Sequence, residues 1–442
     1  MKNDSFSQMF RVLKIKILGL FSIWLLLGFC ISPLYGASSS FINHTVRSGE
    51  SLYKIAGKYL PLSDFYTLSP LVKEIKRLNG VNQIDLKANK KLRIPVVRTK
   101  PVKAKTITKD KSFNAKGIYI TGNTAGTERI LTLAKKLKSF GGNTIIFDAK
   151  DVDGIVTYKS SVPLAKKIGA TRKSQIRDIS KMIYLLHRED IHVVARIALF
   201  CDVILAKKRP DLAVQSKSSE DVWKQKGNIR WVDPSLEMVQ KYNLDLVTEL
   251  CDLGVDEIQF DYLRFPAMGR VKDAKYSFDE ANIEKHTIIT SFLKRAYELT
   301  RRKKVLLSID VYAITAWQRK EDEEITGQRI QDLAKYADII SPMLYPSHFY
   351  GRFEGRKNPA DHPYYFISQG CKKTGIATEK TGVTIRPWLQ AFPYKVTRSK
   401  WNKDYILEEI KAAKEANACG WLLWSASNNY KVSWQALKQF KK

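Results

Sequence analysis

Eight short apolar runs, which alternate with longer amphipathic stretches, dominate the chain after its first hundred residues. The runs lie at 117–121, 144–148, 192–200, 257–265, 305–313, 338–345, 384–392 and 420–426. Helical spacing of apolar residues marks the stretches at 127–139, 173–187, 235–253 and 404–416. Because parallel strands need a helical crossover between them, this alternation predicts an α/β fold, a (β/α)₈ TIM barrel over residues 114–442.

A doubly wound open sheet is the alternative fold for the same alternation of strands and helices. Such sheets often carry a glycine-rich phosphate-binding loop directly after the first strand. No loop of that kind follows the run at 117–121. We therefore expect the closed barrel.

The ends of the runs carry unusual side chains for a barrel interior. Side chains two residues apart on a strand share one face. Counting back by twos from the run ends places polar and aromatic groups on one face: Asp148, Arg196, Glu257, Gln259, Asp261, Asp310, Tyr345, Trp388, Gln390 and Trp424. A purely structural barrel would place Val, Ile and Leu there. Because active sites of TIM barrels lie at the C-terminal ends of the strands, the pattern predicts a site at that rim.

This set of side chains suits glycoside hydrolysis, which uses two carboxyl groups as acid, base or nucleophile. The candidate catalytic residues are Asp261, Asp310 and Asp148. Side chains that would bind sugar hydroxyls or stack on sugar rings are Lys150, Arg196, Gln259, Arg264, Tyr345, Trp388, Gln390 and Trp424. We predict no metal and no cofactor, because no His, Cys, Asp and Glu residues have metal-ligand spacing.

Several of these residues have structural alternatives. Lys150 would hold Asp148 ionised, for substrate binding or as a plain ion pair. Asp261 is either catalytic or a structural partner of Arg196 or Arg264. Asp261 with Asp310, on adjacent strands, favours a retaining mechanism, whereas Asp148 with Asp261 leaves room for the water of an inverting one. The sequence leaves this choice open.

Residues 42–96 form a separate unit with a β-α-α-β pattern. A first strand leads through a Ser-Gly turn into a helix with Leu52 and Ile55 at helical spacing, and a second helix precedes the closing run at 91–95. The unit resembles a LysM module. The resemblance implies a groove for N-acetylglucosamine-containing glycans, formed on one side by Gly49, Glu50, Ser51 and Leu52 and on the other by Asn79 and Gly80.

The second part of the chain resembles a bacterial family of predicted glycoside hydrolases found in exported proteins. Six motifs carry this resemblance, at 145–154, 194–202, 257–266, 308–312, 341–347 and 387–390. It implies a glycosidase-like TIM barrel. Most barrel glycosidases place a carboxylate on the fourth strand, so the resemblance makes Asp261 the first catalytic candidate, Asp310 the second and Asp148 the third.

The first 37 residues predict an exported protein. Basic residues precede an apolar run at 17–31 and small residues follow it, which is typical of a cleavable secretory signal peptide. The run is shorter than the roughly 20 residues of a membrane-spanning helix, so no stable membrane span is expected after cleavage. An uncleaved N-terminal anchor is the alternative.

Positive charge is spread along the whole chain, with a formal net charge of +31. For an exported protein this charge favours anionic cell-wall polymers or membrane surfaces, and no nucleic-acid-binding motif is present. Residues 97–113, rich in lysine, predict an extended basic linker, a solvated tether or a contact for wall polymer. Together these features predict an exported glycoside hydrolase that acts on cell-wall or another polysaccharide. A non-catalytic glycan-binding or scaffold protein is the alternative, and it would have all its rim acids in ion pairs.

Overall fold

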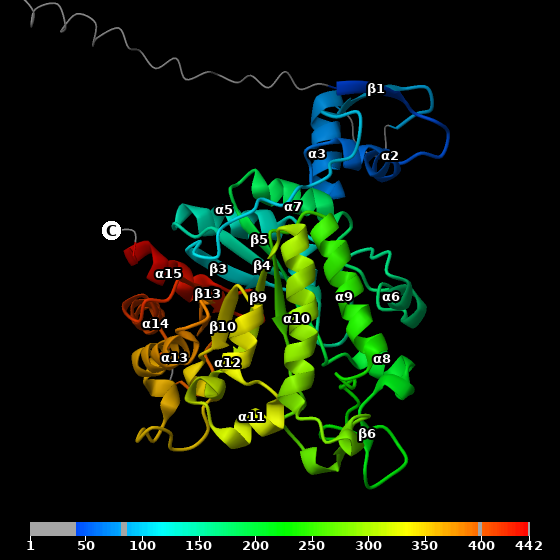
Figure 1. Ribbon diagram of the computed structural model, residues 1–442. Helices are drawn as coiled ribbons and strands as arrows, with labels where there is room; N and C mark the ends of the chain where they lie inside the picture. Colours follow the sequence, from blue (N-terminus) through cyan, green and yellow to red (C-terminus); the bar gives the residue numbers. More distant parts are fainter. Residues whose placement is uncertain (1–40, 81–85, 397–399, 441–442) are drawn as a thin grey trace, which may run out of the picture.

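The structure is a computed structural model that describes residues 41–80, 86–396 and 400–440, and its main feature is a closed barrel (Figure 1). Within these residues the barrel has eight parallel strands, each paired with its neighbours, and the last pairs with the first. The strands are β3 (Ala115–Ile120), β4 (Thr144–Lys150), β5 (His192–Ala198), β7 (Glu257–Asp261), β9 (Leu306–Tyr312), β10 (Ile339–Met343), β12 (Trp388–Gln390) and β13 (Gly420–Trp424). The predicted TIM-like fold is confirmed.

Helices surround the barrel and return the chain to the start of each next strand (Figure 1). The longer ones are α5 (Arg129–Ser139), α7 (Ile179–His187), α9 (Glu237–Asp252), α10 (Lys285–Lys303), α13 (Pro363–Thr378), α14 (Lys403–Glu415) and α15 (Lys431–Phe440). Side-chain caps fix where two of them begin: Asp178 accepts a hydrogen bond from the Lys181 amide at α7, and Asn402 does the same for two amides at α14. Such caps satisfy amides that have no partner within the helix.

Shorter elements lie in the loops that leave the C-terminal ends of the strands. They include α4 (Gly122–Ala125), α6 (Pro163–Ile168), α8 (Val203–Lys208), α11 (Lys320–Thr326), α12 (Ile330–Leu333) and a small antiparallel pair, β6 (Gln215–Ser216) and β8 (Ala274–Lys275). A two-residue strand, β11 (Thr384–Ile385), precedes β12 and also pairs with β10. These loops place additional surface around the rim at which the predicted site lies.

The barrel closes where β13 meets β3, and a glycine makes this contact possible. Gly420 has a φ of +89°, and a Cβ atom there would lie 1.9 Å from the Ala115 carbonyl oxygen. Glycine alone reaches this backbone conformation without a steric penalty. The close approach of the first and last strands therefore depends on Gly420.

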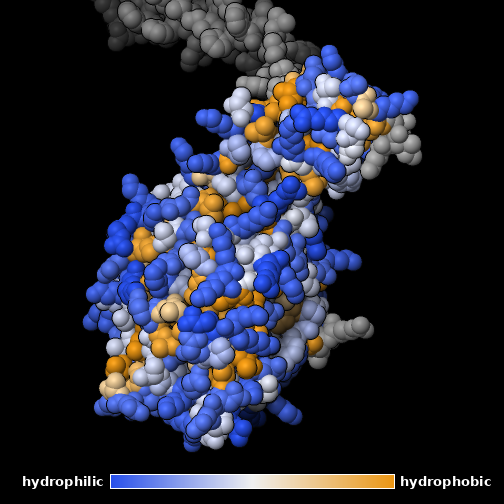
Figure 2. Space-filling view, turned by 90° about the vertical axis from the view of Figure 1, so that its right-hand side faces the viewer, coloured by the Kyte–Doolittle hydropathy of each residue, from blue (hydrophilic) through white to orange (hydrophobic). Residues whose placement is uncertain are grey.

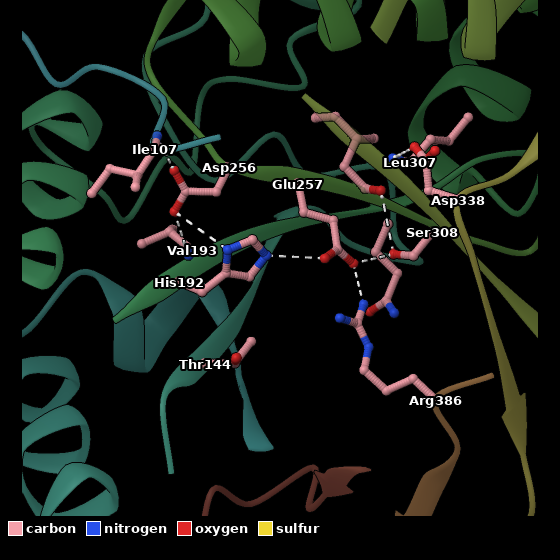
Figure 3. A network of polar contacts seen from close by, with 12 residues as sticks. Ile107, Thr144, His192, Val193, Asp256, Glu257, Leu307, Ser308, Asp338 and Arg386 are labelled. Atoms are coloured by element: carbon pink, nitrogen blue, oxygen red, sulfur yellow. Dashed lines mark hydrogen bonds and ion pairs between the residues drawn. The ribbon is translucent and has the colours of Figure 1, made fainter. Parts of the chain in front are cut away.

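A network of charged side chains fills the barrel at the N-terminal ends of the strands (Figure 3). The Glu257 carboxylate forms an ion pair with Arg386, accepts a hydrogen bond from Ser308 at 2.5 Å and lies 3.0 Å from His192 Nε2. Burial alone would raise the pKa of Glu257, but Arg386 and His192 outweigh it and lower the pKa to about 2. The buried Glu257 carboxylate thus joins the first parts of β5, β7 and β9 to the segment between β11 and β12.

The linker between the two units packs against this end of the barrel. Asp256, one residue before β7, accepts hydrogen bonds from the amides of Ile107 at 2.6 Å and Val193 at 2.8 Å (Figure 3). Thr106 donates to the Val255 carbonyl at 2.9 Å. The linker is extended, as expected, but it is not a freely solvated tether, because its backbone and small side chains find partners on the barrel.

The N-terminal unit consists of β1 (Phe41–Thr45), α2 (Leu52–Tyr59), α3 (Leu68–Asn79) and β2 (Lys91–Pro95), and β1 pairs with β2 in antiparallel fashion. It has its own small core, separate from the barrel core. In Figure 1 it lies near α7, at the opposite end of the molecule from α11 and β6. Figure 2 shows it as a separate lobe on a mainly hydrophilic surface. The predicted β-α-α-β unit is confirmed.

Specific polar contacts fix this unit on the barrel. The Tyr66 hydroxyl donates to the Ala125 carbonyl at 2.5 Å, and Thr67 donates from its amide and its hydroxyl to Glu128 at 2.8 Å. The Lys181 ammonium group donates to the Leu60 carbonyl, and burial lowers the pKa of Lys181 to about 8. The orientation of the N-terminal unit relative to the barrel is therefore set by contacts and not by the linker alone.

Among the residues that the structure describes, no helix is long and apolar enough to cross a membrane. The predicted signal segment, residues 1–37, lies outside the described residues. Export therefore stays a prediction.

Glu257→Gln tests the network in Figure 3. The substitution leaves the buried Arg386 without its ion-pair partner. At pH 7 we therefore expect a loss of about 3 kcal/mol in the free energy of unfolding. The folded pKa of Glu257, about 2, is depressed, so its contribution is present above the unfolded value of 4.5 and is lost as pH falls toward 2. The difference between variant and wild type should therefore narrow below pH 4.5.

Urea unfolding of both proteins between pH 7 and pH 3 measures this difference. Glu298→Gln, on the exposed face of α10, is the matched control and should change stability little at any pH. A Glu257→Gln difference that stays constant down to pH 3 would show that Glu257 is not held ionised by the network.

Candidate active site

Side chains from all eight barrel strands, or from the residues directly after them, converge at the C-terminal end of the barrel. They are Tyr119 on β3, Asp148 on β4, Arg196 on β5, Asp261 on β7, Asp310 on β9, Tyr345 after β10, Trp388 on β12 and Trp424 on β13. Arg196 and Asp148 are direct neighbours in the sheet register, and Asp261 pairs with Ala198. The predicted convergence of acids, an arginine and aromatic rings is present.

Arg196 is the centre of this cluster. Its guanidinium group forms ion pairs with Asp148 and with Asp261, each at 2.5 Å, and all three side chains are buried. The guanidinium carbon lies 5.0 Å from the Trp424 ring centroid and 5.7 Å from that of Tyr119. Because Arg196 neutralises two carboxylates from neighbouring strands, it fixes their positions and removes much of the cost of burying them.

Asp310 has a different environment from the other two acids. Its Oδ1 atom accepts a hydrogen bond from Trp388 Nε1 at 2.7 Å, and no cation among the described residues forms an ion pair with it. Burial raises the pKa of Asp310 well above its ordinary value, and the charge of Asp261 raises it further. Asp310 is therefore the rim acid whose raised pKa is not opposed by an ion pair among the described residues.

Asp148 is held from two sides. Its two oxygens accept hydrogen bonds from Arg196 and from the Tyr119 hydroxyl. Burial raises the pKa of Asp148, while both donors oppose this effect. With its two oxygens bonded to these donors, Asp148 positions Arg196 and Tyr119.

The chain turns sharply at the end of β7, which carries Asp261. Tyr262 has a φ of +54°, a left-handed conformation that is uncommon outside glycine, and its amide donates to Asp261 Oδ1 at 2.6 Å. One carboxylate oxygen of Asp261 thus accepts a hydrogen bond from Arg196, and the other accepts one from the backbone of the turn. Residues in such conformations cluster at functional sites, where the surrounding contacts compensate the strain.

Aromatic rings line the side of the cluster opposite β7. Tyr119 stacks on Trp424 with ring centroids 3.8 Å apart, and Trp424 meets Trp388 edge-to-face at 5.5 Å. Trp388 is fully buried, whereas Trp424 is partly exposed. A partly exposed indole beside carboxyl groups suits the apolar face of a sugar ring.

The prediction that Lys150 holds Asp148 ionised is wrong. The Lys150 ammonium group lies outside the barrel interior, 2.9 Å from Asp202 and 2.9 Å from Asn243 on α9, with a third hydrogen bond to the Leu199 carbonyl. A register shift between Asp148 and Lys150 in the pairing with β5 accompanies this placement. Lys150 therefore joins β4 to the helix layer and is 1 % exposed.

The amides and the second arginine lie near the cluster but have internal partners. Gln259 lies deeper in the barrel, 3.4 Å from the Ser341 hydroxyl. Arg264 is buried, with its guanidinium carbon 4.2 Å from the Tyr312 ring centroid and 4.8 Å from that of Trp231. Gln390 bonds to the two loops that follow β10 and β12. Their predicted roles in substrate binding stay predictions.

In the N-terminal unit the predicted glycan-binding side chains also make internal contacts. Glu50 lies 2.8 Å from His44 Nε2 and accepts from the Arg47 amide, and Ser51 caps α2. The Asn79 amide bridges to the backbone of Arg93. Gly49 and Gly80 have positive φ angles, and Leu52 belongs to the core. These side chains shape the turn and the helix ends, and their predicted roles in glycan binding stay predictions.

Tyr119 is the one member of the cluster that sequence reasoning missed. The same counting by twos applied to the first strand would have placed Tyr119 on the inner face. Sequence reasoning placed Glu257 on the inner face but did not pair it with His192 or Arg386, which lie 65 and 129 residues away along the chain. Only the closed barrel brings these three together.

Residues 117–430 match the family described as "Putative glycosyl hydrolase domain". The chain belongs to this family. Residues 44–95 match the LysM domain, so a LysM domain precedes the glycosyl hydrolase-like barrel. A comparison with curated protein sequences gives no match.

Solved structures of similar fold include glycoside hydrolases. The PgaB (BpsB) glycoside hydrolase domain from Bordetella bronchiseptica is 11 % identical, with coverage of 73 % of this chain and 98 % of that one and a TM-score of 0.54. Alpha-L-fucosidase isoenzyme 2 from Paenibacillus thiaminolyticus is 12 % identical, with coverage of 74 % and 49 % and a TM-score of 0.50. At these identities the likeness shows the barrel fold alone.

A hypothetical protein from Ruminiclostridium thermocellum ATCC 27405 is more similar in sequence. It is 36 % identical over 44 % of this chain and 97 % of its own, with a TM-score of 0.40.

Asp261→Asn and Asp310→Asn should affect stability differently. Asp261→Asn breaks a buried ion pair with Arg196, so we expect a loss of about 3 kcal/mol in the free energy of unfolding at pH 7. A raised folded pKa makes Asp310 stabilising only at low pH, and this contribution is lost as pH rises toward the folded pKa. Asp310→Asn should therefore be as stable as wild type at pH 7, or more stable.

Chemical unfolding at pH 7 measures both effects, with the exposed Asp153→Asn as the control. Equal destabilisation by the two rim substitutions would contradict the different environments of Asp261 and Asp310.

Proposed function

We propose that this chain is an exported glycoside hydrolase whose proton donor is Asp310 and whose second carboxyl group is Asp261. The observation that carries the proposal is the contrast between the two. Asp310 is buried and hydrogen-bonded to an indole and has no ion-pair partner among the described residues, whereas Asp261 forms an ion pair with Arg196. Two carboxyl groups with opposite protonation at the rim of a barrel are the requirement for acid-assisted glycoside cleavage.

In the proposed reaction Asp310 gives its proton to the glycosidic oxygen as the bond from that oxygen to the anomeric carbon breaks. Asp261 supplies the electron pair, either directly to the anomeric carbon or by removing a proton from an attacking water. Arg196 holds Asp261 in place through their ion pair. After bond cleavage the Asp310 carboxylate is left near Arg196, which offsets part of the new charge.

The aromatic wall would bind the sugar next to the bond that is cleaved. Trp388 donates its indole N–H to Asp310 and contacts Trp424 edge-to-face, so the partly exposed Trp424 ring lies close to the proton donor. Stacking of a pyranose face on Trp424 would hold the anomeric carbon near both carboxyl groups.

The LysM domain and the N-terminal sequence suggest where the enzyme acts. LysM domains bind N-acetylglucosamine-containing glycans, and we extend this ligand class to the barrel, as cell-wall polysaccharide. The apolar run at 17–31 supports export through a signal peptide. The net charge of +31 favours retention on anionic wall polymer.

A second candidate is a non-catalytic glycan-binding protein with the same fold. The observation in its favour is that Arg196 engages two of the three rim acids, as in a purely structural ion-pair cluster. The unpaired Asp310 argues against this candidate, because a structural cluster gains nothing from a buried carboxyl group without a cation.

The catalytic assignment predicts that Asp310→Asn and Asp261→Asn each lower turnover by about 10³-fold or more, because each removes several kcal/mol of transition-state stabilisation. Asp310→Asn should do so without loss of stability. The measurement is the release of new reducing ends from purified peptidoglycan and from a panel of polysaccharides.

Wild-type protein and the Asp153→Asn control run beside the two variants in the same assay. Turnover by the wild type that survives in Asp310→Asn would exclude Asp310 as the proton donor. Absence of new reducing ends from any polysaccharide, together with binding, would favour the second candidate.

Because the LysM domain has its own core, a fragment of residues 40–97 should bind insoluble chitin and peptidoglycan by itself. A pull-down at about 0.5 M NaCl, where exposed charges are screened, separates glycan recognition from attraction by charge. Cellulose, which lacks the acetamido group, is the control polymer. A fragment that stays in the supernatant with both acetamido polymers would exclude the anchoring role.

A further inference from the structure

A row of aromatic side chains runs from the acid cluster to the outer surface of the barrel rim. Tyr345 lies at the inner end, and the rings of Phe392 and Tyr345 meet at 5.5 Å. His348 lies 5.8 Å from Phe392 and 6.1 Å from Tyr394. Tyr350 follows on the same loop as His348. The rings thus come from two loops, one after β10 and one after β12, which alternate along the row.

The inner end of the row belongs to the candidate active site. Burial raises the pKa of Tyr345, and the nearby charges of Asp310 and Asp261 raise it further. Tyr345 also packs in one cluster with Trp388 and Trp424. The exposed fraction then rises along the row, from 4 % for Tyr345 to 48 % for Tyr394 and 76 % for Tyr350. The row therefore leads from the buried carboxyl groups into solvent.

A buried amide ties the two loops together. Gln390, at the end of β12, is fully buried and accepts a hydrogen bond from the Ser347 amide at 3.2 Å. Its Nε2 group donates to the Phe392 carbonyl at 3.0 Å and to the Tyr394 carbonyl at 3.4 Å. One side chain thus fixes the loop that carries Tyr350 relative to the loop that carries Tyr394. The two exposed rings are positioned by the barrel and are not merely adjacent on flexible loops.

A cation lies between the two exposed rings. The Lys395 ammonium group is 4.3 Å from the Tyr350 ring centroid and 5.2 Å from that of Tyr394. No carboxylate among the described residues forms an ion pair with Lys395, which is exposed to solvent and contacts the faces of both rings. Exposed rings that hold an ammonium group suit a ligand with apolar ring faces and a negative substituent.

We propose that Tyr394, Tyr350 and Lys395 form a binding platform for the part of a polysaccharide that extends outward from the acid cluster, and that the platform takes pyranose units carrying a carboxylate. This assignment rests on the proposed function of the rim, because the row begins at Tyr345, close to Asp310. It gives the site a direction: the chain of sugars leaves between the β10 and β12 loops. It also gives a substrate class, an acidic glycan.

The test uses the full chain labelled with 3-fluorotyrosine and followed by ¹⁹F NMR. Tyr350→Phe and Tyr394→Phe assign the two lines by their loss. Two probes are titrated: a neutral N-acetylglucosamine hexamer, and an oligomer of alternating N-acetylglucosamine and N-acetylmuramic acid, which carries carboxylates. We expect both lines to shift with the acidic oligomer, and to shift less at equal concentration with the neutral one. The readout is local, so binding at the LysM domain does not obscure it.

Lys395→Gln distinguishes the contribution of the positive charge to binding from the contribution of the tyrosine rings. In this variant the dissociation constant for the acidic oligomer, read from the two tyrosine lines, should rise about tenfold, while that for the neutral hexamer stays within about twofold. The matched control is Lys294→Gln on α10, which removes an ammonium group 5.9 Å from the Tyr336 ring and should change neither value.

Three outcomes would overturn the platform: lines for Tyr350 and Tyr394 that do not move with either oligomer, equal shifts with both oligomers, or equal effects of the two lysine substitutions. The proposed catalytic function fails on a different measurement, since it is contradicted by turnover that survives in Asp310→Asn. Line shifts without hydrolysis would uphold the platform and exclude the catalytic role.

Discussion

The contact on which the rim depends is the double ion pair of Arg196 with Asp148 and Asp261. Three charges from adjacent strands are buried here, and each would be costly alone. Arg196 serves both of these acids, whereas the third, Asp310, has no ion-pair partner among the described residues, and its burial raises its pKa. The difference between a paired and an unpaired carboxyl group, which the proposed chemistry needs, is thus a consequence of having one arginine for three acids.

The barrel holds this arrangement through a second polar layer at its other end. Glu257 joins His192, Ser308 and Arg386 at the strand starts, and Asp256 fixes the linker there. Polar groups thus occupy both ends of the barrel, but the two layers differ in whether each buried acid has an ion-pair partner. The lower layer pairs its acid with an arginine and fixes the strands, whereas the upper layer keeps one acid unpaired. The LysM domain lies near the lower end, opposite α11 and β6 (Figure 1).

Sequence alone predicted the fold and most of the rim because both follow from local periodicity. Counting by twos placed Asp148, Arg196, Asp261 and Asp310 on the inner face, since the strand repeat fixes which side chains share a face. This reasoning could not predict which side chains on different strands form hydrogen bonds or ion pairs with each other. The choice of Arg196 for both Asp148 and Asp261, and of Trp388 for Asp310, depends on distances that only the closed sheet sets. Lys150 was misplaced because the register shift in β4 breaks the simple alternation.

The central claim is that Asp310 carries a proton at neutral pH while its neighbour Asp261 is held in an ion pair. Carbon-13 NMR of protein labelled at the aspartate carboxyl carbons tests it directly, with signals assigned by the Asp310→Asn and Asp261→Asn variants. We predict one carboxyl signal that is still protonated at pH 7 and is absent from Asp310→Asn alone. If no aspartate signal is protonated at pH 7, or if the protonated signal survives in Asp310→Asn, the account is contradicted.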